Sequence, residues 1–277
     1  MKPVAFDYAR PTSLDGVLEA LDAAPGAKIL AGGQTLGPML NLRLVQPALL
    51  VDITRVAALA EVREQDDAVL IGACVTHASI EDGNVADPAN GFLRRIARGI
   101  AYRAVRTRGT IGGSLAHADP AADWLSGFSA LAAEVQIAGP DGARSVPLAD
   151  FVQGVFETAL APNEVLKAIR IPKLGPEARC GFAKISRKTG EFAEAIGVAV
   201  VAPKAGLFRL VAGAGSARPI LLDDPGKLLA GGDPLDAEGF DLDAAVAALA
   251  EAGLEGDPYE LRIHAAAMKR ALAEALA

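Results

Sequence analysis

The sequence predicts an α+β protein in three parts: a small α/β lobe, a second mixed lobe, and a C-terminal domain with an antiparallel sheet and helices. Over residues 1–54, strand-like and helix-like apolar segments alternate, which is typical of a small α/β unit. Beyond this, after Pro172, three apolar segments separated by short turns predict an antiparallel meander, which two alanine-rich helices follow. Pro172–Pro176, with two prolines and a glycine, is the strongest linker candidate. We therefore expect domains over residues 1–54, 55–172 and 173–277.

The elements of the first lobe follow from periodicity and from chain-breaking residues. Leu14, Val17 and Leu21 share one helical face, and Thr12 is the expected N-cap of that helix. Pro25, followed by glycine, ends it. The expected strands cover 4–6, 28–31 and 48–53, and the expected helices cover 14–24 and 38–44.

The same rules apply to the rest of the chain. Asp257 followed by Pro258 is an N-cap with a first-turn proline, and it begins the last expected helix. The expected strands cover 68–73, 134–138, 164–171, 181–186, 196–202 and 208–212, and two expected helices cover 92–100 and 124–133.

The composition excludes several classes of protein. Of 277 residues, 51% are hydrophobic and 22% are charged, which excludes a disordered chain. The net charge of −7 argues against general nucleic-acid binding, which needs Lys and Arg to neutralise phosphates. Two cysteines, Cys74 and Cys180, cannot ligate an iron–sulfur cluster or build a disulfide framework, and with three histidines no metal site is expected.

We expect a cytoplasmic protein without a membrane span. The N-terminus reaches Asp7 without an apolar core, so no signal peptide is expected. No uncharged apolar run reaches the roughly 18 residues that a spanning helix needs. The low cysteine count fits a reducing compartment.

A glycine-rich segment follows the second expected strand. Glycines let a ligand approach the backbone, and free amides before a helix favour an anion, usually phosphate. The segment lacks Gly-Lys-Ser/Thr and G-x-G-x-x-G, so it is neither a P-loop nor a Rossmann loop. A tight strand-to-helix turn without a ligand is the alternative. The segment runs from Lys28 to Pro38, and its candidate ligand-binding residues are Lys28, Ile29, Leu30, Ala31, Gly32, Gly33, Gln34 and Thr35.

A second glycine-rich turn lies in an irregular stretch that ends in carboxylates. Its glycines can bring backbone amides to a diphosphate, and Asp123 can accept hydrogen bonds from sugar hydroxyls. Two such turns in one chain suggest a dinucleotide held between two lobes. The stretch contains Gly109, Thr110, Ile111, Gly112, Gly113 and Ser114, followed by His117, Asp119 and Asp123.

Two further features carry open alternatives. Gly213–Pro219 begins with G-x-G, but Arg218 stands where a Rossmann loop needs a third glycine, so we expect a tight turn before a helix. Six arginines from Arg94 to Arg108 form a basic run in an acidic chain. This run is either a positive field near a diphosphate, a docking face for a partner, or a solvated helix face with one or two structural ion pairs.

The two glycine motifs resemble those of the FAD-binding medium subunits of molybdenum hydroxylases, the family of carbon monoxide dehydrogenase and xanthine dehydrogenase. Ala31–Leu36 followed by Asn41–Leu44 resembles the first family motif, and Thr110–Asp123 resembles the second nearly residue for residue. The likeness runs from Phe6 to the last helix. It implies two α/β lobes of PCMH type that hold extended FAD between them, followed by a C-terminal domain with a three-stranded antiparallel sheet and helices.

The resemblance also assigns cofactor-binding residues in the first two lobes. Lys28–Thr35 and Gly109–Ser114 are implied to wrap the FAD diphosphate and adjoining groups. Asp123 is implied to bind the ribityl chain, and Ala101 and His117 belong to the same implied set. The set contains no catalytic residue and no metal ligand.

Three further residues are implied to lie near the flavin. Leu166 matches a position that contacts the flavin side, and Lys184 matches a family lysine near the cofactor. Phe192 falls where several family members place an aromatic residue beside the isoalloxazine. The alternatives are a solvated strand lysine for Lys184 and ordinary core packing for Phe192.

The implied function is that of an electron-transfer subunit with noncovalent FAD. The family arrangement adds a small iron–sulfur subunit and a large molybdopterin subunit, in a dimer of heterotrimers. Electrons would pass from [2Fe–2S] clusters of a partner through FAD to an external acceptor. One alternative is a self-sufficient FAD oxidase or dehydrogenase of the vanillyl-alcohol oxidase type, which the small C-terminal domain disfavours. Another is a flavin-free assembly subunit, which the intact glycine turns and Asp123 disfavour.

Overall fold

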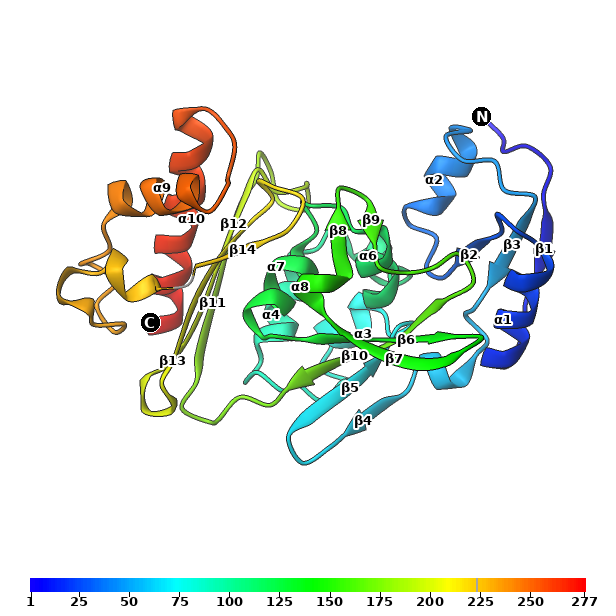
Figure 1. The fold of residues 1–277 in the computed structure, drawn as a ribbon, viewed down its shortest axis with the longest axis horizontal. Helices are drawn as coiled ribbons and strands as arrows, with labels where there is room; N and C mark the ends of the chain where they lie inside the picture. The colour runs from blue at the N-terminus through cyan, green and yellow to red at the C-terminus, as the bar shows by residue number, and fades with distance from the viewer. Residues whose placement is uncertain (223) are drawn as a thin grey trace.

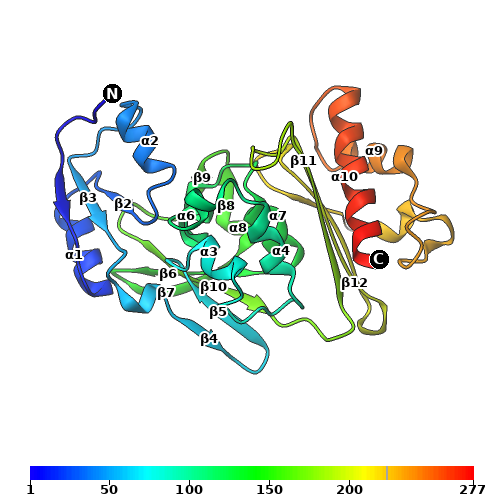
Figure 2. The same cartoon turned by 180° about the vertical axis from the view of Figure 1, so that it is seen from behind.

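Three sheets lie in a row along the molecule (Figure 1). The computed structural model describes residues 1–222 and 224–277. Over these residues the strands form sheets of three, five and four strands and one two-stranded ribbon. The N-terminal sheet lies at one end, the C-terminal helices lie at the other, and the five-stranded sheet lies between them (Figures 1 and 2). The fold is therefore mixed α and β, as the sequence predicted.

The first sheet is small and parallel. Its strands β1 (Asp7–Ala9), β3 (Leu49–Asp52) and β2 (Lys28–Leu30) lie in the order β1-β3-β2. Helix α1 (Leu14–Ala23) buries Val17 and Leu21, as their helical spacing predicted.

Three details of this lobe correct the sequence prediction. β1 begins at Asp7 rather than at residue 4, because Asp7–Ala9 are the residues that pair with β3. Ser13, not Thr12, caps α1, and its side chain accepts a hydrogen bond from the Gly16 amide. Helix α2 (Leu36–Asn41) begins before Pro38 and ends before residue 44.

The second sheet is antiparallel throughout, in the order β4-β5-β10-β6-β7. Its strands are β4 (Val62–Glu64), β5 (Ala68–Gly72), β10 (Val165–Pro172), β6 (Glu134–Gly139) and β7 (Gly142–Pro147). β7 was not predicted because nearly all its side chains are exposed, so it has no apolar alternation. The domain boundaries at 54 and 172 stay a prediction.

Short helices accompany this sheet, and two of them, α4 and α7, also pack against the third sheet. They are η1 (Ala57–Leu59), α3 (His77–Glu81), α4 (Phe92–Gly99), α5 (Arg103–Arg106), α6 (Ile111–His117), α7 (Asp123–Ala130) and α8 (Leu148–Phe151), and the ribbon consists of β8 (Val152–Gly154) and β9 (Glu157–Thr158). α4 and α7 were predicted, whereas the shorter helices have too few turns to show a period.

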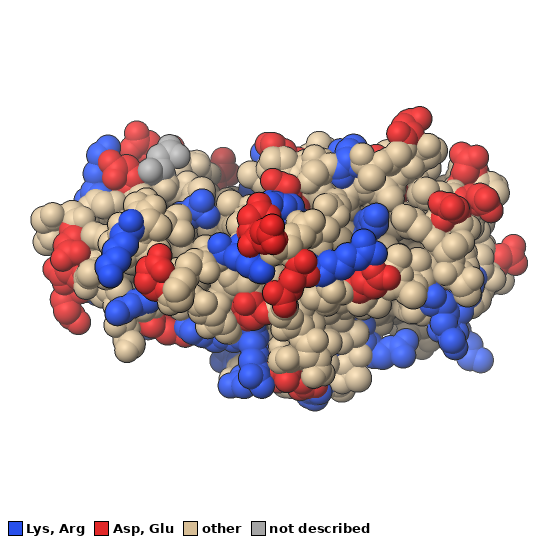
Figure 3. Space-filling view, turned by 90° about the horizontal axis from the view of Figure 1, so that it is seen from below, with Lys and Arg blue, Asp and Glu red and all other residues tan. Residues whose placement is uncertain are grey.

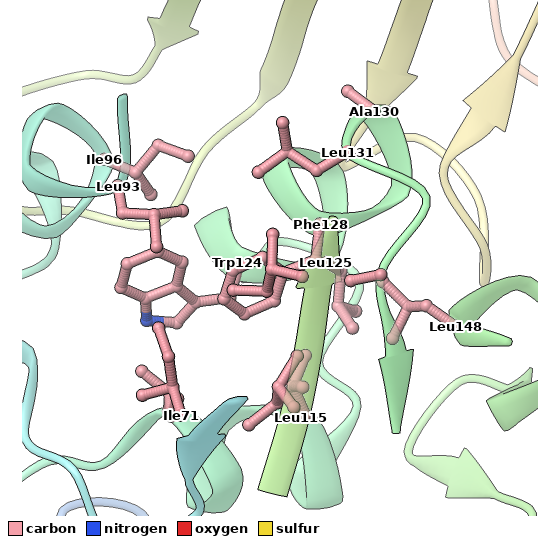
Figure 4. Close-up of a cluster of buried hydrophobic side chains, with 14 of the residues drawn as sticks. Ile71, Leu93, Ile96, Leu115, Trp124, Leu125, Phe128, Ala130, Leu131 and Leu148 are labelled. Carbon is pink, nitrogen blue, oxygen red and sulfur yellow. The ribbon is translucent and has the colours of Figure 1, made fainter. Parts of the chain in front are cut away.

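A continuous core joins the second sheet to the helices above it (Figure 4). The rings of Trp124 and Phe128 stack with centroids 4.9 Å apart, and both are fully buried. Leu115 from α6 and Ile71 from β5 lie in the same cluster. Because α6 and α7 share this core, it fixes the glycine-rich second motif relative to Asp123 at the start of α7.

The C-terminal sheet has four strands, not the three that were predicted. Strands β11 (Arg179–Ile185), β12 (Ala195–Ala202), β13 (Leu207–Gly213) and β14 (Ile220–Leu221) lie in that order and are antiparallel. β14 has only two residues, too few to show a pattern in the sequence. The Gly213–Pro219 segment is a turn, as expected, but it leads into β14 rather than into a helix.

The last helix of the chain packs along this sheet, which α4 and α7 also contact. Around the turns lie η2 (Pro203–Ala205), η3 (Pro225–Leu228) and η4 (Ala230–Gly232), and α9 (Leu242–Glu251) precedes α10 (Pro258–Leu276). Asp257 caps α10 in a capping box with Glu260, which confirms the predicted helix start. In the described part of the chain, no helix is both long and apolar enough to cross a membrane.

Candidate functional site

The first glycine motif forms the turn between β2 and α2. Gly33 has a φ of 70°, a left-handed conformation that favours glycine. Among the described residues, no protein acceptor receives a hydrogen bond from the backbone amides of Gly32, Gly33, Gln34 or Thr35. Backbone amides normally find partners, so a row of free donors at the start of a helix is suited to an anion.

Gly32 brings the two glycine motifs into contact. A Cβ built on Gly32 would lie 2.1 Å from the carbonyl oxygen of Arg108 and 2.8 Å from the Cα of Gly109. A Cβ built on Gly113 would lie 3.9 Å from the Cβ of Ala31. Two loops far apart in the sequence therefore lie side by side, and only glycine fits at position 32.

The second motif is the start of a helix, which corrects the expectation of an irregular turn. Thr110 is the N-cap of α6, and its side-chain oxygen accepts a hydrogen bond from the Gly113 amide at 3.1 Å. The amides of Ile111 and Gly112 donate to backbone carbonyls of the segment between β5 and α3, at 3.1 and 2.9 Å. These three amides already have acceptors, so they do not offer free donors to a diphosphate. Ser114 lies on the same first turn, and its hydroxyl has no protein partner among the described residues.

A buried histidine that the sequence analysis missed supports the second motif. The backbone N–H of His77 donates to the Gly109 carbonyl at 2.9 Å, and its ring Nδ1 accepts from the Trp124 indole N–H at 3.1 Å. A Cβ built on Gly109 would lie 2.9 Å from Nε2 of the ring. Burial lowers the pKa of His77 to about 4, so the ring is neutral, as its acceptor role requires. A lone histidine at the first position of a short helix gave no signal in the sequence.

Asp123 and Lys184 form a buried ion pair between the second lobe and the C-terminal sheet. Lys184 Nζ lies 3.1 Å from each carboxylate oxygen of Asp123, with hydrogen-bond geometry only to Oδ2. Within the described chain, Oδ1 of Asp123 is buried and receives no hydrogen bond. Burial raises the pKa of Asp123, and the lysine charge opposes that rise. The side chain of Lys184 is 13% exposed, so the alternative of a solvated strand lysine is wrong.

The loop between β11 and β12 lies against residues 101 and 102. A Cβ built on Gly190 would lie 3.0 Å from the carbonyl oxygen of Ala101 and 3.2 Å from a ring carbon of Tyr102. Ala101 has a φ of 42°. Phe192, in the same loop, is 70% exposed, so the alternative of ordinary core packing is wrong. Tyr102, which was not predicted, is 60% exposed.

Two predicted residues lie at the margin of this arrangement. The side chain of Leu166 in β10 is only 4% exposed and lies in the hydrophobic cluster, beside a register shift between Leu166 and Ala168. His117 is the last residue of α6, and the centroid of its ring lies 4.8 Å from the ring centroid of Phe156 on the β8–β9 turn. Desolvation lowers the pKa of His117.

A cavity of about 350 Å³ adjoins the first motif. Leu30–Gly33, helix α2 and Arg108 line it, together with Tyr8 and Asp52. The Tyr8 hydroxyl donates a hydrogen bond to the Asp52 carboxylate. The same carboxylate forms an ion pair with Arg10, whose Nε lies 3.2 Å from Oδ2. Tyr8 and Asp52 were not predicted from the sequence, because neither stands in a glycine motif.

Several arginines of the basic run form ion pairs within the chain. This favours the interpretation of the run as a helix face with structural ion pairs, and there are more such pairs than the one or two expected. Arg95 pairs with Glu274 of α10 at 2.7 Å, and Arg103 and Arg106 both pair with Glu81. Seen from below, Lys and Arg lie interspersed with Asp and Glu over the middle of the molecule (Figure 3). No field of one sign covers that face.

The donors and acceptors fit FAD. Four free amides can receive a diphosphate, and the buried Asp123 Oδ1 lacks the hydrogen bond that a ribityl hydroxyl can donate. Gly32 joins these amides to the second motif, and Asp123 with Lys184 lies beyond that motif. In Figures 1 and 2, α6 lies between β2 and α7. In the described residues, no group of three His, Cys, Asp or Glu side chains could hold a metal ion.

Known proteins are similar to this chain in both sequence and fold. Residues 4–174 match the family described as FAD binding domain in molybdopterin dehydrogenase. The chain is 35% identical to the 6-hydroxypseudooxynicotine dehydrogenase complex subunit alpha of Paenarthrobacter nicotinovorans, over 98% of this chain and 91% of the relative. It is 34% identical to the carbon monoxide dehydrogenase medium chain of Afipia carboxidovorans, over 100% of this chain and 99% of the relative.

Solved structures agree with these relatives. A structure of Cu,Mo-CO dehydrogenase superposes with a TM-score of 0.89 at 32% identity, covering 100% of this chain and 99% of the matched chain. Quinoline 2-oxidoreductase from Pseudomonas putida 86 superposes with a TM-score of 0.86 at 34% identity, covering 100% and 98%. The chain therefore belongs to the family of FAD-binding domains of molybdopterin dehydrogenases and is an oxidoreductase subunit of that family.

Proposed function

We propose that the chain binds one FAD noncovalently, in an extended conformation between the first two lobes, with the isoalloxazine towards the C-terminal sheet. The observation that carries this proposal is the contact at Gly32, which sets the free amides of the first motif against the second motif. In this arrangement the first motif receives the diphosphate, while Thr110 and Ser114 supply hydroxyls beside it.

The other end of the site supplies an acceptor and a positive charge. Asp123 Oδ1 accepts a hydrogen bond from the ribityl chain, and the charge of Lys184 favours the carboxylate form of Asp123, whereas burial opposes it. Ala101 and Phe192 lie beside the isoalloxazine. Leu166 and His117 complete the surroundings, Leu166 through its position in β10 beside α6. Bound FAD supplies the redox chemistry, and the chain supplies binding and orientation.

We also propose that the chain transfers electrons from [2Fe–2S] clusters of a small partner subunit to an external acceptor. A large molybdopterin subunit would oxidise the substrate, and the assembly would be a dimer of heterotrimers in the cytoplasm. Two findings support a subunit role. The relatives matched over nearly their whole length are named as a complex subunit and a medium chain, and two cysteines are too few for a cluster.

Coexpression with neighbouring genes tests the subunit role. A tagged chain should purify together with an iron–sulfur chain and a larger molybdopterin chain. The chain alone should be reducible by dithionite and inactive towards N-heterocycles, aldehydes and carbon monoxide. If the isolated chain oxidises any of these with an artificial acceptor, it is a self-sufficient flavoenzyme and the subunit proposal fails.

The Asp123 assignment is tested separately by flavin titration. Asp123→Ala removes one charge-assisted hydrogen bond and should weaken FAD binding by about 1.5–3 kcal/mol. ADP binding should change little, because ADP contains no ribityl chain. Equal loss of FAD and ADP affinity would show that Asp123 supports the fold rather than the ligand.

A further inference from the structure

Arg106 is a buried arginine beside the proposed flavin end of the site. Its side chain is 10% exposed, and its guanidinium binds both carboxylate oxygens of Glu81, at 2.8 and 3.0 Å. Nη1 of Arg106 also donates to two successive backbone carbonyls, those of Ile100 and Ala101, at 2.8 and 3.0 Å. Because these hydrogen bonds are partly buried, losing the arginine would leave their acceptors with fewer partners, and the backbone would have to rearrange.

Nη1 of Arg106 binds both carbonyls at a bend of the backbone, where Ala101 has a φ of 42°. The left-handed conformation is unfavourable for alanine, whose Cβ crowds the following carbonyl. A charge-assisted hydrogen bond to each carbonyl compensates for that strain. Arg106 therefore stabilises a backbone conformation that residues 100 and 101 would not adopt alone.

This bend supports the loop between β11 and β12. Gly190, with a φ of 87°, lies so close to the Ala101 carbonyl that a built Cβ would be 3.0 Å from it. Two residues further along, Phe192 is exposed, and the strand before the loop carries Lys184. A series of direct contacts thus leads from Arg106 through Ala101 to the loop that carries the exposed aromatic side chain.

We propose that Arg106 is a positioning residue for the flavin end of the site. Together with Glu81 it holds Ala101, and through Ala101 the Gly190–Phe192 loop, in the conformation that receives the isoalloxazine. This inference rests on the proposed function, because that function places the isoalloxazine at Ala101 and Phe192. The diphosphate end consists of Gly32–Thr35, with Thr110 and Ser114 beside it, and among the described residues the Arg106 side chain bonds to none of these. The two ends of FAD can therefore be measured separately.

The test compares FAD with ADP binding to the full chain stripped of flavin, using Arg106→Gln and a matched control. Arg103 also pairs with Glu81, at 2.6 Å, and with Asp82, at 2.7 Å, but its side chain binds only these carboxylates among the described residues. Arg106→Gln should weaken FAD binding about tenfold or more, from the loss of charge-assisted hydrogen bonds, and shift the visible spectrum of bound flavin. ADP binding should stay within about twofold, and Arg103→Gln should behave as the wild type does.

A second substitution separates positioning from general stability. Ala101→Gly in the Arg106→Gln background should recover part of the FAD affinity, because glycine adopts a positive φ without steric cost. If Arg106→Gln does not fold, Arg106→Lys serves instead, since lysine keeps the charge but loses the planar fork. Equal losses of FAD and ADP affinity, or an equal effect of Arg103→Gln, would overturn the inference. A wild-type chain that binds no FAD would instead overturn the proposed function.

Discussion

Gly32 has no room for a side chain, and this makes it the sharpest test of the contact between the two motifs. In Gly32→Ala the added Cβ would meet the Arg108 carbonyl at 2.1 Å, so the two loops must separate. We expect a strain of roughly 1–3 kcal/mol, as in overpacked sites, and a corresponding loss of FAD affinity. Fluorescence titration of the flavin-free chain measures it.

Gly37 is the matched control for Gly32. It lies in α2, close to the same loop, and a Cβ built there has nothing within 4 Å. Gly37→Ala should therefore leave the two motifs in contact and cause a smaller loss of FAD affinity than Gly32→Ala does. If Gly32→Ala also binds FAD as the wild type does, the contact between the motifs has no role in the site.

His77 predicts a dependence of stability on pH. Its pKa is about 4 in the folded chain and about 6.5 when unfolded, so between these values the unfolded state binds the proton more readily. Neutral His77 therefore adds up to about 3 kcal/mol to the free energy of unfolding above pH 6.5. This contribution is lost as the pH falls from 6.5 towards 4. In thermal unfolding at pH 4.5–7, His77→Gln should show a shallower decline than the wild type. Parallel curves would contradict a buried neutral His77.

At the scale of single residues, the sequence predicted the glycine positions but not their partners. Glycine-rich segments before helices are a local pattern, so the first motif could be located directly. The pairing of Asp123 with Lys184, and of His77 with Trp124, depends on how distant elements pack. Lys184 was placed near the cofactor only through the family resemblance.

At the scale of elements, α6 shows why a glycine-rich helix start is difficult to predict. Gly112 and Gly113 both lower helix propensity, which favoured the prediction of a turn. The Thr110 cap and the buried side chains of Ile111 and Leu115 outweigh that cost. By contrast, α10 carries a local capping signal at Asp257, and its start was predicted correctly.

The docking of α10 on the C-terminal sheet depends on glycines in the strands. A Cβ built on Gly197 of β12 would lie 2.2 Å from the carbonyl group of Ala267 in α10. Gly197→Ala should lower the free energy of unfolding by roughly 1–3 kcal/mol, measured by urea unfolding. Gly226→Ala is the control, because the nearest atom to its built Cβ is 3.5 Å away. Equal stabilities of the two variants would show that α10 does not pack this closely.

At the scale of the whole molecule, the sequence predicted a mixed α and β fold, and the family comparison supports it. Local patterns located most buried strands and the longer helices. They did not indicate that the five-stranded sheet has the order β4-β5-β10-β6-β7, because β10 pairs with β5 across a long intervening segment. The fourth C-terminal strand, β14, is held by pairing with β13 rather than by its own pattern.

The proposed function requires that this chain holds one FAD without a covalent bond. The most direct measurement is the flavin content of the chain, purified with its partner subunits, before and after acid precipitation. We predict one FAD per chain in the native protein, and all of it in the supernatant after acid treatment. Colour retained in the pellet would contradict noncovalent binding. A colourless protein that takes up no FAD, either alone or with its partners, would contradict FAD binding altogether.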